Sequence, residues 1–165
     1  MTRKLEIERF SLVSSKAFDE VVAALNATVG HPDMAEFWKS THRTRSVGEL
    51  EGAIKKVLGP TGLMLFVAFD HGGIVRKGTG RDTPSPRMIR FVIGNPLIMN
   101  EMAKHVPDAG SYAPVTVLVD ERADGVHLSY DRKGSLLAPY ENPDALKVVK
   151  NLDAKVEDLL QQAAT

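Results

Sequence analysis

The chain has 165 residues, a length that suffices for one domain with its own core, and we expect this domain to span residues 1–165. Its 21 basic and 21 acidic residues balance, which leaves no general electrostatic attraction for nucleic acid or an anionic membrane, so we expect neither as a partner. The absence of cysteine excludes disulfide bonds, a thiolate nucleophile and cysteine-ligated metal centres.

The N-terminal segment predicts both a location and a first strand. Residues 1–10 contain acidic side chains where a signal peptide requires an apolar run, and no later stretch has the apolar length that spans a bilayer. We therefore expect a cytoplasmic protein. Residues 4–13 fit a β-strand whose apolar alternation changes parity, which a bulge near Arg9 would explain.

Helical spacing of apolar residues follows the first strand. Residues 18–29 predict a helix that ends at Gly30. Residues 31–59 then predict an inserted helical pair, in which Trp38 of the first helix packs inward or covers an apolar opening. The second helix of the pair begins at a capping box over residues 46–49.

The middle of the chain predicts strands that flank a basic loop. Residues 63–71 are apolar on both faces until Asp70, which predicts an interior strand at the centre of the sheet. The glycines and prolines of residues 72–86 predict irregular structure. Residues 88–93 predict the next strand, with Arg90 on a face that is either solvated or binds a ligand.

The C-terminal half contains the clearest patterns. Asn95 and Pro96 begin a short helix, and residues 115–130 alternate as a β-hairpin. After Asn142 an apolar stripe extends along about five turns of an amphipathic helix. We expect this helix to lie on one face of the sheet.

Several short motifs occur in order along the chain: F-D-H-G at 69–72, G-N-P at 94–96, A-G-S-Y-A-P-V at 109–115, S-Y-D at 129–131 and L-D-A-K at 152–155. Together they resemble the DUF302 domain family. The resemblance implies an α+β fold with a single antiparallel sheet of about five strands in the order β-α-β-β-β-β-α. It also implies the TATA-binding-protein-like fold class and a frequent dimer. Our assignment of elements agrees, with the inserted helical pair added after the first helix.

Strand direction predicts where a site would lie. In an antiparallel meander the strand ends near residues 94, 115 and 131 meet at the same end of the sheet. The candidate ligand-binding residues there are Asn95, Met102, His105, Tyr112, Tyr130 and Asp131. The alternative is that these polar groups only bond one another across the turns.

A second candidate site lies at the opposite end of the sheet. His71, Arg76 and Arg90, with Lys77 and Arg81 nearby, would bind a phosphate or carboxylate, unless the segment is an ordinary solvated loop. The five histidines show no helical metal-binding spacing, so we expect no metal and no cofactor. A metal centre built from residues distant in sequence stays an alternative.

These patterns contain no catalytic signature, and three classes of function stay open. The first is a non-catalytic small-molecule-binding or accessory protein that holds a small apolar or anionic ligand in an apolar space between the sheet and the C-terminal helix. The second is a small enzyme that uses His, Asp and Tyr in acid-base chemistry. The third is a purely structural or regulatory dimer. We expect a homodimer, because the apolar surface exceeds what one helical layer covers.

Overall fold

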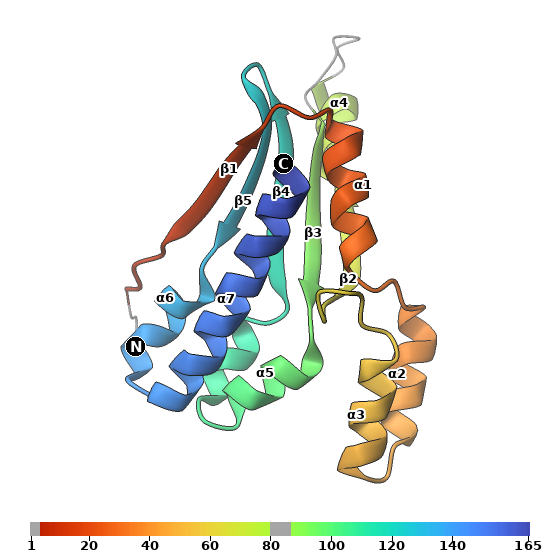
Figure 1. Cartoon of the computed structure of the whole chain (residues 1–165), viewed down its shortest axis with the longest axis vertical. Coiled ribbons are helices and arrows are strands. Elements are labelled where there is room, and N and C mark those ends of the chain that lie inside the picture. The colour runs from red at the N-terminus through yellow and green to blue at the C-terminus, as the bar shows by residue number, and fades with distance from the viewer. Residues whose placement is uncertain (1–3, 80–86) are drawn as a thin grey trace.

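Five strands form one antiparallel sheet in the computed structural model, which describes residues 4–79 and 87–165 (Figure 1). They are β1 (Arg9–Ser14), β2 (Met64–Asp70), β3 (Met88–Gly94), β4 (Val115–Arg122) and β5 (Gly125–Asp131), in the spatial order β1-β5-β4-β3-β2. Consecutive strands from β2 to β5 pair as a meander, and β1 joins its free side beside β5. The predicted α+β class and strand topology are therefore confirmed.

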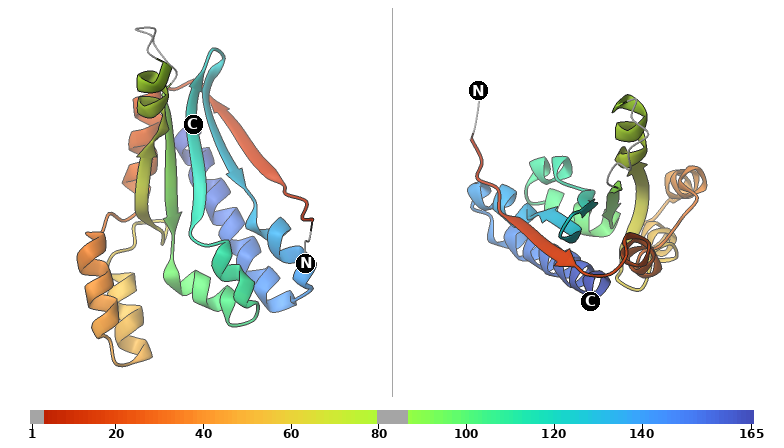
Figure 2. Two further views of the ribbon diagram at one scale, coloured as in Figure 1. Left: turned by 180° about the vertical axis from the view of Figure 1, so that it is seen from behind. Right: turned by 90° about the horizontal axis from the view of Figure 1, so that it is seen from above.

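Helices connect the strands and cover one face of this sheet. They are α1 (Phe18–Thr28), α2 (Met34–Arg43), α3 (Val47–Lys55), α4 (His71–Thr79), α5 (Pro96–Ala103), α6 (Lys133–Leu137) and α7 (Pro143–Ala164), with short 3-10 turns η1 (Pro107–Ser111) and η2 (Ala138–Tyr140). α1 and α7 cover the same face, whereas the view from behind shows β3, β4 and β5 in front of α7 (Figure 2). Among the described residues no helix has both the length and the apolar character of a membrane span.

The main core forms where the long helix α7 crosses the sheet. Asn142 accepts a hydrogen bond from the Ala145 amide at 2.9 Å, and Pro143 occupies the first turn, so both residues begin the helix as expected. Its apolar stripe packs against the inward residues of the strands. The buried residues at this interface include Phe91, Ile93, Val117, Val119, Leu128, Val149, Leu152, Val156 and Leu160. The predicted amphipathic helix on the sheet is confirmed.

The prediction that residues 63–71 form the central strand is wrong, because β2 is an edge strand beside β3. Leu63 and Met64 are fully buried, but Val67 and Phe69 are 39% and 43% exposed. The apolar run is thus covered by different neighbours along its length. Its first residues are buried by helices, and its last four residues, 67–70, are all exposed, so both faces of the strand are open there.

The first strand is shorter than predicted, and its register is regular. β1 begins at Arg9 and pairs without interruption with β5, from Arg9 opposite Asp131 to Ser14 opposite Val126. The predicted bulge near Arg9 is therefore wrong. The change in parity arose because Ile7 precedes the strand and is exposed.

The segment predicted as an irregular basic loop begins as helix α4. The Asp70 carboxylate accepts a hydrogen bond from the Gly73 amide at 2.8 Å, the contact that an N-terminal helix cap makes. This local contact outweighs the low helix propensity of the glycines. Residues 80–86, which include Arg81, lie outside the described part of the chain.

Two glycines attach the helical pair α2–α3 to the sheet. Gly30 and Gly59 both donate amide hydrogen bonds to the Leu63 carbonyl at 2.9 Å, and the Gly30 carbonyl accepts from Leu65 at 2.8 Å. A Cβ atom on Gly30 would lie 1.8 Å from the carbonyl oxygen of Val57. Only glycine permits this close approach of backbones, which places the predicted helical pair beside the end of β2.

Candidate functional site

The meander brings the predicted strand ends to one end of the sheet. Ile93 pairs with Val115, and Val117 pairs with Tyr130, so β3 and β5 end where β4 begins. The polar side chains there, however, contact different partners.

Asn95 organises the loop that precedes β2. Its Oδ1 accepts a hydrogen bond from the Leu97 amide at 2.8 Å, which caps α5, and its Nδ2 donates to the Gly62 carbonyl at 3.0 Å. Lys155 of α7 donates to the neighbouring Thr61 carbonyl at 2.8 Å. Both polar ends of the Asn95 amide are therefore used inside the fold.

Tyr112 belongs to a separate chain of contacts. Its hydroxyl lies 3.3 Å from the Tyr140 hydroxyl, which donates to Asp108 at 2.7 Å. Hydrogen bonds with Tyr112 and Asp108 raise the pKa of Tyr140. Two further predicted residues of this end differ in exposure: Met102 is fully buried in the core, whereas His105 is exposed.

Asp131 pairs with the first strand. The Arg9 guanidinium donates to both Asp131 carboxylate oxygens, at 2.6 Å and 3.0 Å. This hydrogen-bonded pair lowers the pKa of Asp131. Tyr130, one residue earlier, points to the opposite face of the sheet and reaches the underside of α7.

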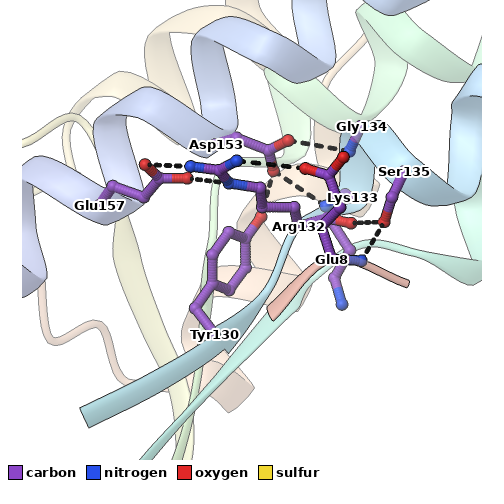
Figure 3. Close-up of polar contacts among 8 residues, drawn as sticks. All are labelled: Glu8, Tyr130, Arg132, Lys133, Gly134, Ser135, Asp153 and Glu157. Atoms are coloured by element: carbon purple, nitrogen blue, oxygen red, sulfur yellow. Dashed lines mark hydrogen bonds and ion pairs between the residues drawn. The ribbon is translucent and has the colours of Figure 1, made fainter. Parts of the chain in front are cut away.

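The densest polar cluster of this region surrounds Asp153 (Figure 3). This carboxylate is only 7% exposed and accepts three hydrogen bonds. The donors are the Tyr130 hydroxyl at 2.6 Å and the amides of Lys133 and Gly134 at 2.9 Å and 2.8 Å. Burial, followed by the negative charge of Asp153, raises the pKa of Tyr130, so the phenol stays protonated and remains a donor.

Arg132 extends this cluster toward the surface. Its guanidinium binds both carboxylate oxygens of Glu157, at 2.6 Å and 3.0 Å, and also contacts Glu8 at 3.1 Å. These hydrogen bonds raise the pKa of Arg132. A hollow of about 390 Å³ adjoins the cluster. Because the main carboxylates already bind partners inside the fold, we interpret the cluster as a tie between β5, α6 and α7.

The space between the sheet and α7, where we expected an apolar ligand, is filled by side chains. The cavity found there measures about 10 Å³ and is lined by Leu25, Val29, Phe91, Ile93, Val117 and Leu159. That volume is comparable to the space occupied by a single water-sized probe. The expected location of the ligand is therefore wrong.

A larger apolar hollow lies outside this interface, between the helical pair α2–α3 and α5. This α3–α5 groove has a volume of about 670 Å³, and its apolar lining includes Phe37, Trp38, Leu50, Ile54, Leu97 and Met99. An adjoining hollow of about 190 Å³ shares Trp38, Pro96 and Met99 with the groove. Trp38 is 45% exposed at this junction. The sequence predicts that Trp38 packs inward or covers an apolar opening, and only the structure identifies α5 as the other wall of that opening.

Comparisons with known proteins identify the family of this fold. A family model described as "Domain of unknown function DUF302" matches residues 39–163. The chain belongs to the DUF302 family. The crystal structure of an uncharacterised conserved DUF302 protein from Bacillus stearothermophilus is similar, with a TM-score of 0.65 and 12% sequence identity. The match covers 94% of this chain and 97% of that one, and at this identity it shows the fold alone. No curated protein matches the chain.

In this DUF302 protein, the motifs that carried the resemblance contribute contacts inside the fold. Tyr130 of S-Y-D bonds Asp153 of L-D-A-K, while Asn95 of G-N-P and Lys155 of L-D-A-K hold adjacent carbonyls. Asp153 was missed as a polar centre because its position on the inner face of α7 resembles an ordinary helix residue until β5 is placed beside it. The TATA-binding-protein-like class stays a prediction.

The second predicted site of this DUF302 protein is divided between two elements. His71 begins α4 and stacks on Phe69 with ring centroids 5.9 Å apart, and an Arg76 nitrogen lies 3.9 Å from the Asp70 carboxylate. Arg90 pairs with Phe69 across the β2–β3 ladder and is exposed on the open face of the sheet. Within the described residues, no three acidic or histidine side chains gather as a metal site would require.

Proposed function

We propose that this protein binds a small, largely apolar molecule in the α3–α5 groove. The observation that carries the proposal is the groove itself, whose volume of about 670 Å³ lies in the range of ligand pockets in proteins, roughly 300–1,000 Å³. The non-catalytic binding role is the one expected from the sequence. The proposed location of the ligand differs, because it is the α3–α5 groove and not the space between the sheet and α7.

The walls of the groove support an apolar ligand. Phe37, Ile54 and Met64 are buried beneath it and form a small second core. Above this core, Trp38 and Met99 remain partly accessible. An indole ring provides a flat apolar surface and a methionine side chain adapts to different shapes, so together they suit a ligand with a flat or irregular apolar body.

The rim of the groove supports a ligand without net charge. Glu51 bonds Lys55 at 2.7 Å, and Glu101 bonds Lys104 at 2.5 Å, so each rim carboxylate is balanced by a neighbouring lysine. His42 and Asn100 also line the groove and offer hydrogen-bonding groups at its edge. A neutral ligand with one or two polar atoms matches this distribution.

The enzyme alternative has less support. Acid-base catalysis needs a histidine and a carboxylate that converge inside a cleft. His42 lines the α3–α5 groove with Glu51 and Glu101, but these two carboxylates bond Lys55 and Lys104. His127 and Asp124 lie 2.8 Å apart, but they belong to the β4–β5 hairpin and do not line the groove.

Trp38 provides a direct test, because it is the only tryptophan of the chain. We expect the neutral apolar dye Nile red to bind with saturation and to change Trp38 fluorescence. Met99→Glu places a carboxylate in the groove, and a desolvation cost above about 1.4 kcal/mol weakens binding about tenfold or more. Ile7→Glu, at an exposed position that precedes β1, is the matched control and leaves binding unchanged. Equal affinities of the wild-type and Met99→Glu proteins, with both folded, contradict the proposal.

The homodimer expected from the sequence stays a second proposal, for which one surface provides support. Ile74 and Val75 of α4 are 69% and 48% exposed, and the exposed Val67 and Phe69 lie on the adjoining edge strand. Exposed apolar residues at a sheet edge are a common site of association.

We expect the wild-type protein to scatter light as a dimer at micromolar concentration and Phe69→Lys to shift it toward the 18.0 kDa monomer. Val47→Lys, at an exposed position of α3, serves as the control and leaves the dimer intact. A wild-type monomer would rule out this proposal.

A further inference from the structure

The open face of the sheet lies opposite α7 (Figure 2). It contains a polar hollow that is separate from the α3–α5 groove. It has a volume of about 190 Å³ and is lined by residues of four strands: Arg9, Arg90, Thr116, Leu118, Ser129, Tyr130 and Asp131. Arg90 pairs with Leu118, which in turn pairs with Ser129. These three side chains therefore stand in one row across β3, β4 and β5.

The charges in this hollow leave one arginine available. Arg9 and Asp131 neutralise each other through two hydrogen bonds. Arg90 is exposed, and no carboxylate of the described residues lies within ion-pair distance of it. The hydroxyls of Thr116 and Ser129 likewise have no hydrogen-bond partner in the described part of the chain.

Lys133 does not line the hollow, but its positive charge interacts with that of Arg90. Its ammonium group lies 5.7 Å from the centre of the Tyr130 ring. Burial lowers the pKa of Lys133, the carboxylates of Asp131 and Asp153 oppose this shift, and the positive charge of Arg90 contributes to it.

We propose that this hollow binds a small oxyanion, the phosphate or carboxylate group of a small molecule. Arg90 supplies the principal charge, since a guanidinium donates two parallel hydrogen bonds to a planar pair of oxygens. Thr116 and Ser129 supply hydroxyl donors, and Leu118 forms an apolar floor. The carboxylate of Asp131 also borders the hollow, but its charge is balanced by Arg9. A water molecule occupies roughly 30 Å³ in the liquid. The hollow, with a volume of about 190 Å³, therefore has room for an oxyanion with a small substituent.

The test is a titration with inorganic phosphate at constant ionic strength, followed by amide chemical shifts in two-dimensional NMR spectra. We expect saturable shifts confined to residues near Arg90, Thr116 and Ser129. Arg90→Gln should weaken phosphate binding about tenfold or more, because a charge-assisted pair is lost. Arg43→Gln, which removes an exposed arginine from α2, should leave it unchanged.

A second variant and a second anion complete the design. Ser129→Ala should weaken phosphate binding several-fold, and it decides the outcome if Arg90→Gln fails to fold. Acetate that shifts the same amides shows that the site also takes carboxylates, whereas a response to phosphate alone restricts it to phosphate groups. Met99→Glu should bind phosphate like the wild type, so failure of the groove and failure of this site are distinguishable. Shifts without saturation, or unaltered affinity in the folded Arg90→Gln or Ser129→Ala variant, overturn the proposal.

Discussion

Gly30→Ala should abolish folding or lower the free energy of unfolding by more than about 4 kcal/mol, among the largest effects of a single substitution. The added Cβ would lie 1.8 Å from the Val57 carbonyl oxygen and 2.9 Å from the Gly59 amide nitrogen. Neither backbone can move away without loss of hydrogen bonds, because Gly30 is held by Leu63 and Leu65 on its other side. Urea denaturation followed by circular dichroism measures the loss.

The matched control for this prediction is Gly52→Ala, within helix α3. Nothing lies within 4 Å of a Cβ atom at Gly52, and alanine favours a helix over glycine by roughly 1 kcal/mol. We expect this variant to be as stable as the wild type or slightly more stable. A Gly30→Ala protein with the stability of Gly52→Ala would show that the contact of the helical pair with β2 is misplaced.

Asp153→Ala is expected to lower the free energy of unfolding by about 4 kcal/mol. The substitution removes the carboxylate that accepts three hydrogen bonds. The donors that lose this acceptor are the Tyr130 hydroxyl and the amides of Lys133 and Gly134. A buried donor that loses its partner costs about 1–3 kcal/mol. For a protein of this size the melting temperature should fall by on the order of 10 °C, which differential scanning calorimetry detects.

Two further variants separate this polar tie from a general effect on α7. Asp158→Ala removes an exposed carboxylate of the same helix and should change stability by no more than about 0.5 kcal/mol. Tyr130→Phe removes only one donor, so it should cost less than Asp153→Ala, and the double variant should show coupling. Additive effects of Tyr130→Phe and Asp153→Ala would contradict a shared hydrogen bond.

The candidate site was only partly predictable, since its polar and apolar parts depend on different kinds of contact. Asn95 was identified as a helix cap, and it is one, because capping involves residues two or three positions apart. Asp131 was identified as a polar end of β5, but its partner Arg9 lies 122 positions away. The α3–α5 groove needs three helices that are separated in the chain, so Trp38 alone could not reveal it.

The sequence by itself determined helices α1, α5 and α7, the helical pair α2–α3, the β4–β5 hairpin and the antiparallel pairing of the later strands, because periodicity, caps and turn residues act over a few positions. Only the tertiary structure decided that β2 is an edge strand. An apolar run in the sequence indicates that a segment is buried, but it does not indicate which neighbouring element buries it. It also decided that α7 packs on the sheet without space for a ligand. Close packing of side chains from distant segments fills that interface, and the apolar hollow remains where the helical pair meets α5.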